Sequence, residues 1–413
     1  MTHEHPPSRY RWLILSLATV TNAVVVAAPM MALSVLFNEI QSDLNLSLVE
    51  VGALWSIAAL PGILTSLLGG ALGDRFGPKR LLVIVCVTAG IFGALRGFAF
   101  DFVSLLTLNL IVGGLTTLVP MSGFKACGMW FPPRQLGLAN GILSIGMAGG
   151  FLMGSLVSAT WLSPLLGGWR NVLIFYGVLG GLLVIPWLFT RAAPPQAVLP
   201  ADVARPVAPP MREALMAVGR LRSIWLLGFV LFGLSGCIQA ALGYLPLFLR
   251  NGGWAPATAD SALALFHTVS LVFTLPIALG SDRLGSRKRV LVAAMVAMVL
   301  GIGAIGLVSG PAVWGAVVLA GFVRDGFMAI FMTAVVEVEG VGSRFAGTAT
   351  GFVILFSSIG NLLAPPIGNS LAAYGLGLPF LFWAGLAAVA LVILTMVPEG
   401  RRPDEVVALA EPA

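Results

Sequence analysis

Arg324 lies near the middle of the apolar run 312–335, which is long enough to cross a membrane as a helix. A cation at that depth costs roughly 2.5–3.5 kcal/mol on insertion scales, so it needs water, a partner or a ligand. The planar guanidinium can bind a carboxylate through two parallel hydrogen bonds. We therefore expect either an anion-binding arginine, which we favour, or an ion pair with a carboxylate on another helix.

Two more titratable residues lie in apolar runs. Asp325 follows Arg324 directly, and neighbouring residues on a helix point in different directions, so these two side chains do not face each other. Asp325 is a candidate proton carrier, or an anchor that holds its helix to a neighbour. His267 is a candidate for the same proton path, although a single interhelical hydrogen bond is the interpretation we favour.

Uncharged polar residues also interrupt the apolar runs. Each of them can contact a solute or form an interhelical hydrogen bond worth about 0.6–2 kcal/mol. The candidates for substrate binding are Asn22, Asn109, Gln239 and Tyr244, together with Arg324.

The composition indicates the medium in which these residues fold. Of 413 residues, 58% are hydrophobic and 10% are charged, with a mean hydropathy of +0.99, whereas soluble domains carry about 25% charged residues. The net charge of +6 comes from short loops and forms no stripe, so nucleic-acid binding is not expected. The three cysteines have no metal-ligand spacing, and we expect neither a metal nor a cofactor.

Twelve apolar runs are long enough to span a bilayer, which predicts an all-α integral membrane protein. The runs are 12–36, 51–72, 81–99, 103–124, 137–160, 170–190, 223–249, 259–280, 290–309, 312–335, 345–370 and 376–397. With both termini in the cytoplasm, 19 of the 23 Lys and Arg residues fall on the cytoplasmic side. Arg96, Arg170 and Arg250 fall on the opposite side, and this asymmetry predicts the orientation in the inner membrane.

A proline-rich stretch follows the sixth run. It predicts an extended cytoplasmic linker at 191–222, between six-helix bundles at 1–190 and 223–400, with a cytoplasmic tail at 401–413.

The two halves carry a repeated loop. Gly73–Arg80 recurs as Ser281–Arg289, with Asp74 and Asp282 separated by 208 residues. Arg134–Gly141 recurs as Arg344–Gly351, with a separation of 210 residues. An internal repeat of six-helix units is typical of transporters.

At these residues the chain resembles the Major Facilitator Superfamily. Gly70–Arg80 is similar to the family signature between helices 2 and 3, and Asp282–Arg289 to its partner between helices 8 and 9. The resemblance covers the whole chain. It implies two pseudo-symmetric six-helix bundles that rock about a midplane cavity lined by helices 1, 4, 7 and 10.

The resemblance also implies a conformational gate, in which the two loop aspartates hold the cytoplasmic face shut. Asp74 would lie near the start of helix 11, and Asp282 near the start of helix 5. The residues expected in this gate are Gly70, Asp74, Arg75, Gly77, Lys79, Arg80, Asp282, Arg283, Gly285, Arg287, Arg134 and Arg344.

The residues Trp130–Pro133 resemble members that carry organic or small inorganic anions, such as cyanate and oxalate/formate permeases. Helix 5 carries Gly146, Gly150 and Gly154, a face for close packing, and lacks the Gly-Pro pair of drug/proton antiporters. We expect a monomeric secondary transporter of a small organic anion, with proton coupling left open. The alternative is export of hydrophobic or antimicrobial compounds. No metalloprotease, P-loop or nucleophile motif predicts an enzyme.

Overall fold

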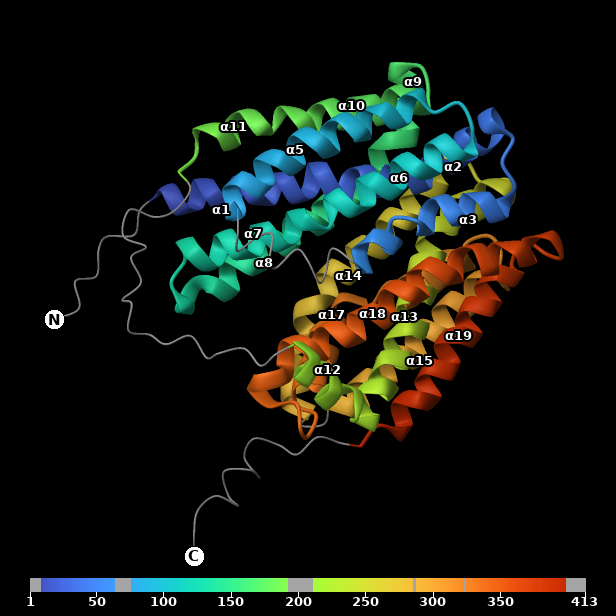
Figure 1. Ribbon diagram of the computed structural model, residues 1–413. Helices are drawn as coiled ribbons and strands as arrows, with labels where there is room; N and C mark the ends of the chain where they lie inside the picture. The colour runs from blue at the N-terminus through green and yellow to red at the C-terminus, as the bar shows by residue number, and fades with distance from the viewer. Residues whose placement is uncertain (1–8, 64–75, 192–210, 285–286, 323, 399–413) are drawn as a thin grey trace, which may run out of the picture. The chain divides into compact units, whose positions relative to one another are not determined.

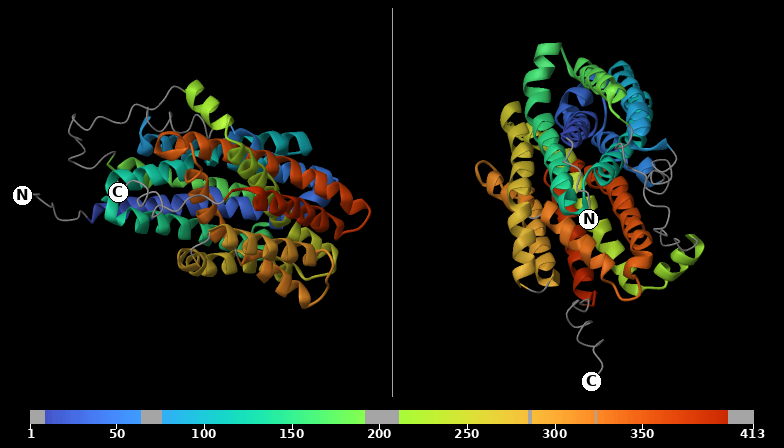
Figure 2. Two further views of the ribbon diagram at one scale, coloured as in Figure 1. Left: turned by 90° about the horizontal axis from the view of Figure 1, so that it is seen from below. Right: turned by 90° about the vertical axis from the view of Figure 1, so that its left-hand side faces the viewer.

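The computed structural model describes residues 9–63, 76–191, 211–284, 287–322 and 324–398. Within these ranges the regular structure is helical, without strands (Figures 1 and 2). The elements are α1 Tyr10–Thr21, η1 Asn22–Ala27, α2 Ala28–Leu44, α3 Leu48–Ser56, α5 Pro78–Leu95, η2 Arg96–Phe98, α6 Phe102–Thr116, α7 Leu118–Trp130, α8 Pro133–Val157, η3 Ser158–Leu162, α9 Ser163–Leu166, α10 Trp169–Leu182, α11 Val184–Phe189, α12 Met211–Gly219, α13 Arg222–Asn251, α14 Pro256–Leu284, α15 Arg287–Ile305, α16 Ala312–Gly321, α17 Arg324–Val336, α18 Gly342–Ser370, η4 Leu371–Ala373 and α19 Leu378–Met396.

This is a multi-pass membrane protein. Among the described residues, nine helical segments are long and apolar enough to cross a bilayer, and Leu48–Ile63 and Ala312–Gly321 are shorter apolar helices. Part of the predicted span 51–72 lies outside the described residues. The predicted span 312–335 consists of two helices, α16 and α17. The total of twelve spans stays a prediction.

The described chain forms two compact units. Unit 1 comprises 1–203, 242–268 and 365–370, and unit 2 comprises 204–241, 269–364 and 371–413. Segments of α13, α14 and α18 thus belong to the same unit as the N-terminal helices. The bundle boundaries expected from the sequence stay a prediction.

The range 191–222, predicted to be an extended linker, contains a helix. Met211–Gly219 forms α12, because the prolines end at Pro210 and residues 211–218 are mostly good helix formers. Residues 192–210 and the predicted tail lie outside the described residues.

In unit 1, glycines bring helices into direct backbone contact. A Cβ added at Gly146, Gly150 or Gly154 of α8 would lie 2.2–2.7 Å from atoms of Thr19, Ala23, Ala27 or Ala28. On α5, a Cβ added at Gly90 would lie 2.7 Å from Gly181 of α10, and α5 runs beside α10 in Figure 1. Glycine is required here because any larger residue would separate the two helices.

In unit 2, glycines also allow neighbouring helices to come into close contact. A Cβ added at Gly306, just after α15, would lie 2.5 Å from the Gly377 oxygen next to α19, and one at Gly236 of α13 would lie 2.8 Å from the Gly360 oxygen of α18. Helices α15 and α19 therefore approach closely, as do α13 and α18.

The repeated loop makes the same contact in both units. Lys79 at the start of α5 donates to the carbonyls of Leu188 and Thr190 after α11. Lys288 at the start of α15 donates to the carbonyls of Thr395 (2.8 Å) and Val397 (2.6 Å) at the end of α19. In each case a cation satisfies carbonyls at a helix C-terminus, where the helix dipole favours positive charge.

Candidate functional site

Asn22 lies at the start of η1, a π-helical turn within the first span. Its side chain is 2% exposed, and its Nδ2 donates to the Ala18 carbonyl at 2.9 Å. Its Oδ1 has no hydrogen-bond partner among the described residues. A Cβ added at Gly123 would lie 3.1 Å from Nδ2, so Asn22 faces α7. π-Helical turns inside α-helices are frequent at functional sites.

Asn109, on α6, is held by an arginine. Its Oδ1 accepts a hydrogen bond from Arg96 Nη1 at 3.2 Å, and both side chains are buried. The sequence placed Arg96 among the cations on the side opposite the cytoplasm. In the structure η2 carries Arg96, whose side chain lies in the interior of unit 1 and is 5% exposed.

Arg324 is the first residue of α17, and α16 ends at Gly321. Its side chain is half-buried in unit 2. Asp325 is the second residue of α17, and its side chain lies outside the described part of the structure. Residue 323 lies outside the described residues, so α17 is described from Arg324 onward, inside a predicted span.

The other substrate candidates belong to both units. Gln239 is half-buried on α13 in unit 2. Tyr244, also on α13, is 1% exposed in unit 1, with its ring centroid 6.1 Å from that of Phe248.

His267 is buried on α14. Its Nε2 lies 3.2 Å from the sulfur of Met31, and its ring stacks on Phe151 with centroids 5.2 Å apart. The imidazole therefore joins α14 to α2 and α8.

The expected gate is described only in part. Gly77 has φ +74°, a conformation that favours glycine, and it leads directly into Pro78 at the start of α5. Lys79 binds the carbonyls after α11, and Arg80 is exposed. Outside the described residues lie Gly70, Asp74, Arg75 and Gly285, and also the side chains of Asp282, Arg283, Arg287, Arg134 and Arg344.

Unit 1 contains a buried polar network that sequence reasoning missed. Arg250 Nη2 lies 2.5 Å from Asp260 Oδ1, with the two side chains 8% and 1% exposed. Thr160 donates to the other carboxylate oxygen at 2.8 Å. From the sequence, Arg250 is only a cation on the side opposite the cytoplasm. Its partner Asp260 lies ten residues later, on the other side of the α13–α14 connection.

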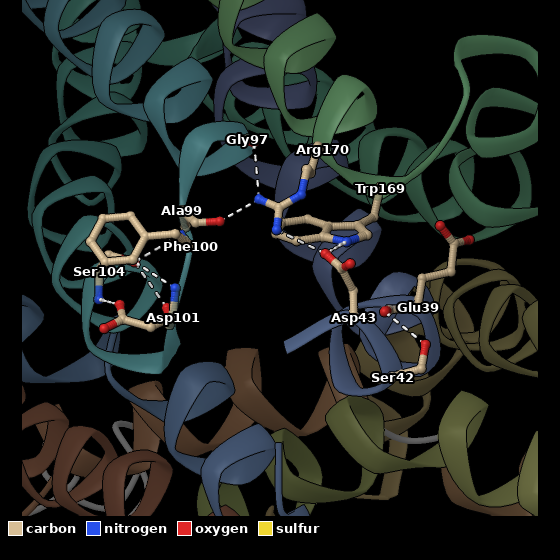
Figure 3. Close-up of polar contacts among 10 residues, drawn as sticks. All are labelled: Glu39, Ser42, Asp43, Gly97, Ala99, Phe100, Asp101, Ser104, Trp169 and Arg170. Atoms are coloured by element: carbon tan, nitrogen blue, oxygen red, sulfur yellow. Dashed lines mark hydrogen bonds and ion pairs between the residues drawn. The ribbon is translucent and has the colours of Figure 1, made fainter. Parts of the chain in front are cut away.

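A second arginine–carboxylate pair, which is exposed, lies elsewhere in unit 1 (Figure 3). Arg170 pairs with Asp43 at 2.8 Å, and the Trp169 indole N–H donates to the same carboxylate oxygen. Arg170 also donates to the Gly97 and Ala99 carbonyls. This cluster ties the start of α10 to the end of α2 and to the α5–α6 connection.

The family model of the Major Facilitator Superfamily matches residues 15–338 and 250–412. The chain belongs to the Major Facilitator Superfamily. This confirms the resemblance carried by the repeated loop.

Curated members of the superfamily are similar over most of the chain. The hexuronate transporter of Bacillus subtilis (strain 168) is 24% identical over 362 residues, covering 81% of this chain and 82% of the relative. The 3-(3-hydroxy-phenyl)propionate transporter of Escherichia coli (strain K12) is 25% identical over 338 residues, covering 80% and 79%. The gallate transporter of Pseudomonas putida is 25% identical over 411 residues, covering 91% and 89%.

Solved structures share the superfamily fold. The nucleoside transporter NupG gives a TM-score of 0.78 at 15% identity, covering 94% of this chain and 99% of that chain. A bacterial homologue of the human lysosomal transporter Spinster, in an inward-facing and unoccupied conformation, gives 0.72 at 18% identity, covering 95% and 96%. At these identities the likeness establishes the fold alone.

Proposed function

We propose that this protein is a secondary transporter that moves a small organic anion, such as a carboxylate, across the membrane. The observation that carries the proposal is Arg324, a half-buried cation within an apolar run. Its guanidinium offers a fixed fork of donors that matches the two oxygens of a carboxylate.

The relatives support this substrate class. Hexuronate, gallate and 3-(3-hydroxy-phenyl)propionate are carboxylates, and they are what the similar transporters are named for. None of these names describes an exporter of hydrophobic compounds, so the exporter alternative is not favoured. Transport itself breaks and forms no covalent bond, and we do not propose an enzyme.

The proposed mechanism is alternating access between two six-helix bundles of a twelve-span monomer in the inner membrane. Asn22, Gln239 and Tyr244 are proposed to contact the solute with Arg324. The loops around Asp74 and Asp282 are proposed to close the cytoplasmic side. Asp325 is the proposed proton carrier, because the contacts of His267 with Met31 and Phe151 favour a packing role for that residue.

Uptake into liposomes tests the proposal. The purified protein is reconstituted and supplied with labelled galacturonate, gallate or 3-(3-hydroxyphenyl)propionate. Arg324→Ala removes a charge-assisted contact worth about 1.5–3 kcal/mol, so uptake of the transported anion should fall about 10- to 150-fold. Arg324→Lys keeps the charge and should recover part of the rate.

Arg220→Ala is the matched control, because Arg220 is an exposed cation outside the apolar runs. Its uptake should equal that of the wild type. Unimpaired anion uptake by a folded Arg324→Ala protein would overturn the proposed site, and wild-type protein that moves drugs but none of these anions would overturn the proposed function.

A further inference from the structure

Arg96 is a buried cation without a carboxylate partner. It is 5% exposed, and no Asp or Glu of the described residues forms an ion pair with it. Its hydrogen bonds run from Nε to the Gly93 carbonyl at 3.3 Å and from Nη1 to Asn109 Oδ1 at 3.2 Å. A guanidinium has five N–H donors, and its other N–H groups find no acceptor within the described ranges.

Arg96 lies two residues before the end of the apolar helical segment Pro78–Phe98, and its guanidinium reaches Asn109. Asn109 is seven residues into α6, which places its side chain roughly 10 Å from the start of that helix. A buried ion that lacks a counter-charge is strongly destabilising. Within the part of the chain that the structure describes, no carboxylate neutralises this charge.

A second buried donor lies on the side chain that Arg96 contacts. Asn109 is 3% exposed, and its Nδ2 has no hydrogen-bond partner among the described residues. The Oδ1 of this amide is occupied by Arg96, so the unused group is an N–H donor. The unmet requirement of both side chains is thus an acceptor with negative charge.

A small cavity borders Arg96. It is lined by Arg96 together with Val112 of α6, Gly93 of α5 and Tyr176 and Gly177 of α10, and its volume is about 10 Å³. That volume holds about one water-sized particle. The glycines create the space, since a Cβ added at Gly93 would lie 3.9 Å from Arg96 Nη2 and 3.4 Å from Gly177 Cα.

We propose that Arg96 forms a binding site for one monatomic anion, of the size of chloride, inside the N-terminal half of the transporter. The guanidinium supplies the charge and the N–H donors, and Asn109 holds it through Oδ1. The cavity is too small for a hexuronate- or gallate-sized solute, so this site is separate from the proposed substrate site at Arg324. A water molecule would fill the space and leave the charge uncompensated.

Thermal unfolding with different anions tests this site. Sodium chloride and sodium gluconate are compared at equal ionic strength, because gluconate does not fit the cavity. We expect a higher Tm in chloride for the wild type, since a ligand that binds the folded state stabilises it. The difference should disappear in Arg96→Gln, which removes the cation.

Asn109→Asp keeps the test decisive if Arg96→Gln fails to fold. The aspartate puts a carboxylate within reach of Arg96 and so supplies the counter-charge from the chain itself. Its Tm should be the same in chloride and gluconate, and in gluconate it should exceed that of the wild type. Arg170→Gln is the control, because Arg170 already has Asp43 as a partner, and its chloride response should match the wild type.

A crystal grown in sodium bromide locates the anion directly. An anomalous peak in hydrogen-bonding contact with Arg96 would support the proposal. Density without an anomalous signal would identify a water and overturn it. Equal Tm values in chloride and gluconate for the wild type would also overturn it, as would an Arg96-dependent stabilisation by galacturonate and not by chloride.

Discussion

Two arginine–carboxylate pairs in unit 1 have short contacts but very different surroundings. Arg250 and Asp260 are 8% and 1% exposed, whereas Arg170 and Asp43 are 37% and 47% exposed. An exposed pair is screened by water and contributes little. A buried pair has lost its hydration, so removing one partner leaves an isolated charge in a medium of low polarity.

Asp260→Asn should therefore destabilise the protein far more than Asp43→Asn. The first change leaves Arg250 buried without its counter-charge and should cost about 3–5 kcal/mol. The second removes an exposed charge and should cost about 0.2–1 kcal/mol. Unfolding of the two variants in the same detergent measures the difference. Equal destabilisation would show that the Arg250–Asp260 pair is hydrated in the folded protein.

At the scale of helices, close approach depends on which face of a helix carries its glycines. Gly149 and Gly150 are neighbours on α8, but they point in different directions. A Cβ at Gly150 would lie 2.7 Å from the Ala23 oxygen and 2.7 Å from the Ala27 Cβ, whereas a Cβ at Gly149 meets nothing within 4 Å. Glycine at position 150 is therefore needed for close helix packing, whereas the position of Gly149 has room for a larger side chain.

Alanine at these two positions should have opposite effects. Gly150→Ala forces α8 away from the first span and should cost about 1–3 kcal/mol. Gly149→Ala should stabilise the protein by about 0.4–1 kcal/mol, because alanine restricts the unfolded chain and meets no neighbour. Thermal melts of the two single variants compare them directly. A stabilised Gly150→Ala protein would contradict the packing described for unit 1.

For the whole molecule, the testable property is its orientation in the membrane. Among the described residues the native cysteines Cys86, Cys127 and Cys237 are buried, so they offer little background to an impermeant thiol reagent. Met216 of α12 is 48% exposed, and Ala257 near the start of α14 is exposed. The predicted orientation places these two positions on opposite sides of the membrane.

Single-cysteine labelling of whole cells checks this orientation. Ala257→Cys should react in intact cells, and Met216→Cys should react only after the membrane is permeabilised, because the basic loops are predicted to stay in the cytoplasm. Labelling of the denatured proteins controls for reactivity. The reverse pattern would reject the orientation with both termini in the cytoplasm.

The sequence by itself determined the membrane class, the position of most helices, the repeated loop and the superfamily. These follow from properties of short segments: apolar length against bilayer thickness, the placement of Lys and Arg, and a motif that recurs after 208 residues. Arg324 was recognisable for the same reason, since one charge within an apolar run is visible without any fold.

Only the tertiary structure decided which polar groups are buried and with whom. The sequence places Arg96 near the end of the apolar run 81–99 and Arg250 just after the run 223–249, and it does not name their partners. In the structure Arg96 contacts Asn109, and Arg250 pairs with Asp260, which also accepts from Thr160. Such contacts depend on how each helix is rotated and how closely the glycines let its neighbour approach. The rotation of a helix about its axis and its distance from a neighbouring helix are set by the packing of whole helices. Neither can be read from a short segment of the sequence.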